Sequence, residues 1–74
     1  MLFEKGNEFI EITQAISAHT NDAVWFVYTN LDWDNLPAEF RVQVPETDQE
    51  GLETLKNDLV KWADRKGFKL VLKV

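Results

Sequence analysis

The chain has 74 residues and no cysteine, with 45% hydrophobic residues, 28% charged residues and a net charge of −5. This length supports one domain (residues 1–74) with a thin core, and the composition is typical of a folded globular protein, not of a disordered one. The lack of cysteine excludes disulfides, cysteine–zinc sites and thiol nucleophiles. The chain also has no signal-peptide pattern and no long apolar stretch, so we expect a cytoplasmic protein without a membrane span.

The first twenty residues allow two interpretations. A Gly-Asn pair at residues 6–7 can turn a hairpin between the two short segments beside it. Ile10, Ile12 and Ile16 suit a strand period that Gln14 interrupts. Phe9, Ile12 and Ile16 also fit a helical period that begins at an N-cap asparagine. The β-branched content favours the strand. We therefore expect strands here, with residues 7–20 left open between strand and helix.

Residues 23–28 (AVWFVY) form an unbroken apolar run, which predicts a strand that is apolar on both faces. A single helix covers only one face of a sheet, so one of the two side-chain sets of this strand is left for another molecule. Our candidates for the outward set are Trp25 and Val27, with Val71 beside them. A helical N-terminal segment folded over this face would remove the need for such a partner.

Residues 30–37 form a polar loop that carries Trp33 between Asp32 and Asp34. Tryptophan is enriched among the residues that dominate protein–protein binding, so Trp33 is a candidate anchor, although its ring can equally fold back onto the sheet. The alternating oxygen side chains resemble the start of a calcium-binding loop, but the position that needs a glutamate is Arg41. We expect no bound metal and no other cofactor.

The second half of the chain contains three further elements. Residues 40–44 alternate as a strand does, residues 47–50 (TDQE) fit a capping box, and apolar residues at helical spacing predict a helix over about 48–66. Gly67 ends this helix, and residues 68–74 alternate as a last strand. The prediction is an α+β domain with a mostly antiparallel sheet of four to five strands, one long helix on one face and the order β-β-β-β-α-β.

Charge is divided unevenly along the chain. Residues 1–53 hold eleven acids and two bases (net −9), whereas residues 54–74 hold two acids and six bases (net +4). The basic end supplies candidate nucleic-acid contacts, which are Lys61, Arg65, Lys66, Lys69 and Lys73. We expect these side chains mainly to complement the helix dipole and to protect a strand edge, because the acidic remainder repels nucleic acid.

The sequence contains no arrangement of residues that is typical of a catalytic site. His19 is the only histidine, and no serine or acid forms a triad-like arrangement with it. A thin domain with one helix has little room for a substrate pocket, so we expect neither an enzyme nor a small-molecule substrate.

We therefore expect a non-catalytic module that binds another protein as an inhibitor or adaptor. Phage-encoded inhibitors of host nucleic-acid-handling proteins have this size and charge, and act by charge complementarity. The alternatives are a homodimer that buries the free sheet face and, third, a weak nucleic-acid binder that uses the basic end.

Overall fold

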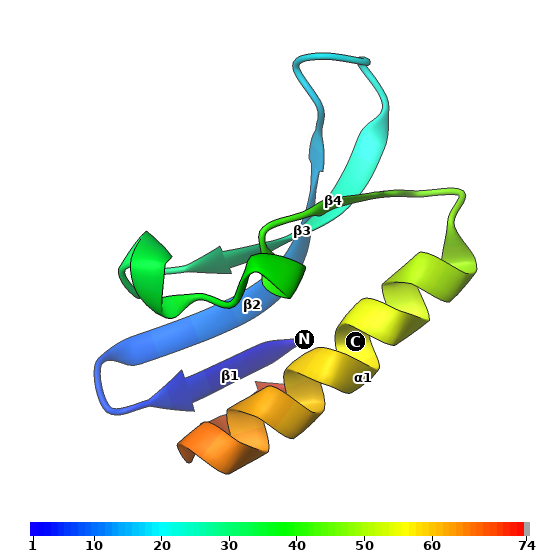
Figure 1. Ribbon diagram of the computed structural model, residues 1–74. Helices are drawn as coiled ribbons and strands as arrows, with labels where there is room; N and C mark the ends of the chain where they lie inside the picture. The colour runs from blue at the N-terminus through cyan, green and yellow to red at the C-terminus, as the bar shows by residue number, and fades with distance from the viewer. Residues whose placement is uncertain (74) are drawn as a thin grey trace.

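Within residues 1–73, the part of the chain that the computed structural model describes, five strands form one sheet and one long helix packs against it (Figure 1). The elements in chain order are β1 (Leu2–Lys5), β2 (Glu8–Ile16), β3 (Ala23–Thr29), the short 3₁₀ turns η1 (Trp33–Asn35) and η2 (Ala38–Phe40), β4 (Gln43–Pro45), α1 (Gln49–Lys66) and β5 (Lys69–Leu72). The predicted α+β class and the β-β-β-β-α-β order are confirmed.

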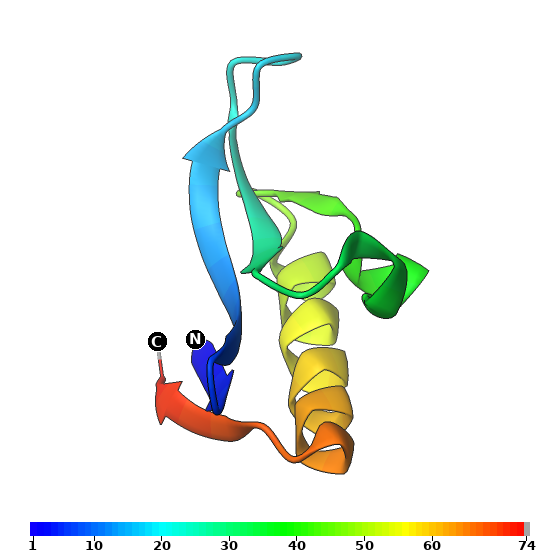
Figure 2. The ribbon, with the colours of Figure 1, turned by 90° about the vertical axis from the view of Figure 1, so that its left-hand side faces the viewer.

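The sheet has the strand order β4-β3-β2-β1-β5, and every neighbouring pair is antiparallel. Gly6 turns the chain between β1 and β2 with a φ of 59°, a left-handed conformation that glycine adopts without a steric penalty. The open question about the N-terminal segment is resolved in favour of strand, because β2 joins the sheet instead of lying across it as a helix. The tip of the β2–β3 hairpin, residues 17–22, extends beyond the body of the domain (Figure 2).

α1 and the loop between β3 and β4 lie on the same side of the sheet, which we call the inner face (Figure 2). The opposite side, the outer face, is covered by no other element of residues 1–73. The core fills the space between the inner face and these two elements. Its buried members are Phe3, Ile10, Ile12, Val27, Leu36, Phe40, Val44, Leu52, Leu55, Leu59, Trp62, Ala63 and Phe68.

The start of α1 differs from the predicted capping box of Thr47 and Glu50. The N-cap is Asp48, whose Oδ1 accepts the backbone N–H of Gly51 at 2.9 Å. A carboxylate accepts such a bond more strongly than a hydroxyl does, and its charge complements the positive end of the helix. The cap therefore moves one residue along the chain, and the helix begins at Gln49.

The end of α1 follows the prediction. Gly67 has a φ of 83°, and the N–H of Phe68 reaches back to the carbonyl of Ala63 at 2.9 Å. Lys5 from β1 donates its Nζ to the carbonyl of Lys66 at 2.8 Å and lies 5.8 Å from the centre of the Phe68 ring. A cation thus binds the negative end of the helix. No helix in the described part of the chain is long and apolar enough to cross a membrane.

Three packed aromatic rings connect the loop, the helix and the start of β5. The ring centres of Phe40 and Trp62 are 5.8 Å apart, and those of Trp62 and Phe68 are 5.7 Å apart. This packing corrects the predicted strand over 40–44: Phe40 lies in η2 and is 1% exposed, and β4 is only Gln43–Pro45. In η2, Phe40 is buried against Trp62, and burial of a large aromatic ring stabilises the turn in place of a longer strand.

β5 is shorter than the strand predicted over residues 68–74, and it forms one edge of the sheet. Phe68 precedes it and is buried, but the three apolar residues at 70–72 are 47% to 55% exposed. The predicted apolar face of this strand is therefore only partly buried. Val74 lies outside the described residues.

Candidate functional site

The register places four apolar residues on the outer face of the sheet, opposite to the core residues Ile10, Ile12 and Val27. They are Phe9, Val24, Phe26 and Tyr28, which we call the outer-face patch. The ring centres of Phe9 and Tyr28 are 5.5 Å apart. Tyr28 is 55% exposed, whereas Phe9 and Phe26 are half-buried and Val24 is enclosed by its neighbours on β2 and β4. An uncovered aromatic patch of this kind is typical of an interaction surface.

Trp25 and Val27, which we expected to face outward, face inward. Val27 pairs with Ile12 of β2 and is 7% exposed in the core, and Trp25 pairs with Val44 of β4 and packs half-buried against the core. The register explains this outcome, because Ile10 and Ile12 of β2 are buried in the core and their partners on β3 must share that side. Val71 is 55% exposed on the edge strand β5, which β2 and β1 separate from β3, so it does not lie beside Trp25 and Val27 as we expected.

A groove of about 380 Å³ opens beside the second half of β3, where the chain that precedes β4 is not paired with it. Its lining includes Tyr28 and Thr29 from β3 together with Leu31, Trp33, Arg41 and Val42 from the loop. The groove thus joins one edge of the outer-face patch to the loop that the sequence singled out.

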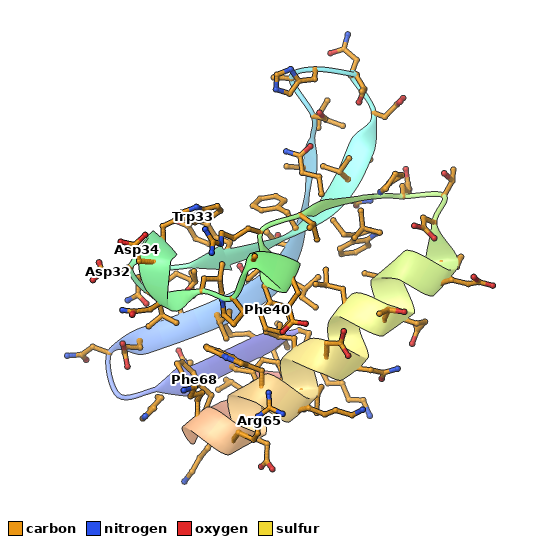
Figure 3. The ribbon with its side chains drawn as sticks, viewed as in Figure 1. Asp32, Trp33, Asp34, Phe40, Arg65 and Phe68 are labelled. Carbon is orange, nitrogen blue, oxygen red and sulfur yellow. The ribbon has the colours of Figure 1, made fainter. Side chains whose placement is uncertain are left out.

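Trp33 stands at the rim of the groove and is 59% exposed, so its ring is not folded onto the sheet. The guanidinium of Arg41 lies 5.6 Å from the centre of this ring, a cation–π contact that gives the exposed indole a preferred orientation. Asp32 and Asp34 flank Trp33 in and before η1, and both are exposed (Figure 3). The side chain of Asp32 makes no capping bond to the turn.

The loop that presents Trp33 is anchored from beneath. Leu36 and Phe40 are each 1% exposed and point into the core, so both turns of the loop are fixed by packing. At the start of the loop, Asn30 accepts the N–H of Phe9 at 2.9 Å and donates to the carbonyl of Asn7 at 2.8 Å. An exposed aromatic residue on an anchored loop loses little conformational entropy on binding.

The candidate nucleic-acid contacts lie in another region, on the last turns of α1 and on or just after β5. All of them are exposed, and they are Lys61, Arg65, Lys66, Lys69 and Lys73. Arg65 projects from α1 far from Trp33 (Figure 3). Among residues 1–73 the one ion pair joins Lys56 and Glu53 at 3.9 Å, so these bases are not engaged with acids of the same chain.

His19 lies exposed in the tip of the β2–β3 hairpin, where its backbone N–H donates to Ser17 Oγ at 3.3 Å. Across the part of the chain that the structure describes, no three acidic or histidine side chains converge as metal ligands do. Asp32 and Asp34 point into solvent instead of toward a common centre (Figure 3).

These features define a small α+β domain with one uncovered sheet face and one groove beside it. The comparisons with protein families, with curated proteins and with solved structures found no match to this chain.

Sequence reasoning missed several residues of the groove, among them Tyr28, Arg41 and Val42. Tyr28 belonged to the side-chain set that we expected to face the helix. Arg41 is one of only two bases in residues 1–53, and this isolation was a signal that could have drawn attention to it. Its contact with Trp33 joins residues eight positions apart in an irregular loop, where no periodicity applies.

Proposed function

We propose that this protein is a non-catalytic module that binds another protein through the groove beside β3. The observation that supports this function is that exposed Tyr28, Trp33 and Arg41 meet at one groove. Tyrosine, tryptophan and arginine are the residue types that dominate measured binding hot spots. The apolar outer-face patch continues the same surface, so a partner that fills the groove can also cover Tyr28 and its neighbours.

The charge of the chain supports a role as an inhibitor or adaptor of a basic partner. Residues 1–53 carry a net charge of −9 and include the whole groove and its rim. A basic surface on a larger protein, such as a nucleic-acid channel, is complementary to this charge and would be steered toward it. Binding should therefore weaken as salt rises.

The test is quantitative affinity capture with three immobilised proteins: the unchanged protein, Trp33→Ala and Ile16→Ala. Ile16 is the matched control, because it is an apolar side chain of similar exposure at the far end of the β2–β3 hairpin. We expect one captured protein to be retained by the unchanged protein and by the Ile16 variant, and to be lost with the Trp33 variant. Equal capture by all three proteins would contradict the proposal.

A homodimer that buries the outer face is the second candidate function, and the uncovered outer-face patch is the observation that favours it. Glu4 and Glu11 alternate with Phe3 and Ile10 and so share the outer face, where a two-fold axis would bring carboxylates of both copies together. This repulsion ranks the homodimer second. Sedimentation equilibrium at micromolar concentration tests it, and a monomer mass would reject it.

Nucleic-acid binding by the basic end is the third candidate. The exposed, unpaired bases of α1 and β5 are the observation behind it. A gel-shift experiment at low salt that shows no retardation would reject it.

A further inference from the structure

The ladder between β3 and β4 stops halfway along β3. β4 pairs with Val24, Trp25 and Phe26 only, whereas β3 continues to Thr29. Within residues 1–73 no strand lies opposite the last three residues of β3 on this side. The groove described above occupies this position.

The backbone groups of Val27 and Thr29 point into the groove. The carbonyl of Ala23 accepts the N–H of Glu46 at 3.1 Å on the β4 side, and the carbonyl of Asp22 accepts the N–H of Ser17 at 2.8 Å on the β2 side. Backbone groups alternate in direction along a strand, so the odd-numbered residues of β3 all point toward β4. At Val27 and Thr29 that side is open.

The register identifies the residue that could have paired with Val27 but does not. Trp25 pairs with Val44, so the next antiparallel partner of Val27 would be Val42. Val42 lies outside β4, is 43% exposed and lines the groove instead. The chain therefore moves away from β3 at this point and leaves the width of the groove between them.

An open strand edge beside exposed aromatic side chains is the arrangement by which domains accept an extended peptide as an added strand. Backbone hydrogen bonds from Val27 and Thr29 would give such a segment its alignment, and Tyr28 and Trp33 would contact its side chains.

The charge of the loop beside the groove indicates which kind of peptide segment would bind. The loop beside the groove carries exposed Asp32, Asp34 and Glu39, and its one base, Arg41, lies over the ring of Trp33. A basic segment is attracted to this rim, and an acidic one is repelled. We propose that Val27 and Thr29 accept an extended, lysine- or arginine-bearing segment of another protein as an added strand, a binding mode that depends on the protein-binding function proposed above.

The experiment uses random linear peptides displayed on a surface and selected on the full-length protein. The tightest selected peptide is then titrated into isotopically labelled protein, and the backbone amide resonances are followed by NMR. We expect selected peptides to be rich in lysine or arginine and free of proline. On binding, the amides of Val27 and Thr29 should shift and their hydrogen exchange should slow at least about tenfold. The amide of Trp25, already in the ladder with Val44, is the internal control.

Two changes to the peptide separate strand addition from general attraction. Methylation of alternate backbone nitrogens removes the hydrogen bonds to one side, so binding should be lost in one of the two methylation registers and kept in the other. Replacement of its basic residues by glutamate should weaken binding at least about tenfold.

Each unfavourable outcome points to a different failure. A selected peptide that needs Trp33 but leaves the amides of Val27 and Thr29 unchanged would overturn strand addition and keep the protein-binding function. The absence of any peptide whose binding depends on Trp33 would overturn strand addition together with the groove as the binding site. Concentration-dependent shifts of the same amides without peptide would assign the groove to a second copy and overturn the proposed occupant.

Discussion

At the N-terminus of α1, the Asp48 cap and a side chain larger than glycine at position 51 would compete for the same space. Asp48 Oδ1 accepts the N–H of Gly51 at 2.9 Å, which places the carboxylate directly over the α-carbon of that glycine. A Cβ built on Gly51 would collide with Asp48 Oδ2 and would lie 2.8 Å from its Cγ. Alanine at position 51 therefore requires the Asp48 side chain to leave its capping position. The backbone itself is no obstacle, because Gly51 is not among the glycines with positive φ.

The magnitudes predict near-complete cancellation. Replacing a helical glycine by alanine stabilises a helix by about 1 kcal/mol, and losing an aspartate N-cap costs about 1 kcal/mol. Gly51→Ala alone should leave the free energy of unfolding within about 0.5 kcal/mol of the unchanged protein. Asp48→Ala alone should lower it by about 1 kcal/mol. In the double variant the gain from alanine is no longer opposed, so its stability should return to about that of the unchanged protein.

Urea unfolding of the four proteins, followed by tryptophan fluorescence, measures this cycle. The coupling between the two positions should be about 1 kcal/mol in the direction that stabilises the double variant. If Gly51→Ala stabilised the protein equally with and without Asp48, the carboxylate would not occupy the position over Gly51. Asp48 and an alanine side chain at position 51 would then not be in conflict.

Three further outcomes follow from the loop and the hairpin. Phe40→Ala should lower the free energy of unfolding, measured in urea, by about 3 kcal/mol or more, because it leaves a cavity beside Trp62. A loss below about 1 kcal/mol would show that this ring does not anchor the loop. Trp33→Ala should change the same free energy by no more than about 0.5 kcal/mol, since its ring is exposed, and a large loss would mean that the ring is structural. Asn21 has a φ of 61°, a conformation that costs a β-branched residue about 1–2 kcal/mol. Asn21→Val should therefore lower the midpoint of thermal unfolding, whereas Asn21→Gly should leave it nearly unchanged. Equal midpoints for the two variants would argue against this backbone conformation.

The sequence predicted α1 most closely, because its pattern had no competitor. The leucines of α1 repeat with a single period and Gly67 is an unambiguous stop, so the bounds of the helix were close to those observed. The capping box placed the N-cap at Thr47, whereas the structure has it at Asp48, a difference of one residue that only the geometry of the first turn reveals.

The sides of β3 could not be predicted from its own residues. Both side-chain sets of residues 23–28 are apolar, so period and hydrophobicity give the same answer for either orientation. The choice is made by β2, where Ile10 and Ile12 share one side and Glu11 between them points to the other. A strand that alternates clearly thus determines which way its ambiguous neighbour faces, but only once the register of the pair is known.

The candidate site was predicted in part for the same reason. Trp33 and its two aspartates were visible as an unusual loop, and in the structure Trp33 lines the groove with the exposed Asp32 and Asp34 on either side of it in the chain (Figure 3). The groove itself arises because Phe40 turns inward and shortens β4, which a local alternation of residues does not reveal.

The position of β1 between β2 and the edge strand β5 has a kinetic consequence. β1 pairs with β2 across a turn of two residues. Its partners on β5 are distant in sequence: Leu2 pairs with Leu72, near the other end of the described chain. Closing the larger loop from an unfolded chain costs roughly 3 kcal/mol more entropy than closing the hairpin. The N-terminal hairpin can therefore form early, while β5 joins late, after α1 has brought the chain back. Substitutions in β5 should then accelerate unfolding more than they slow folding.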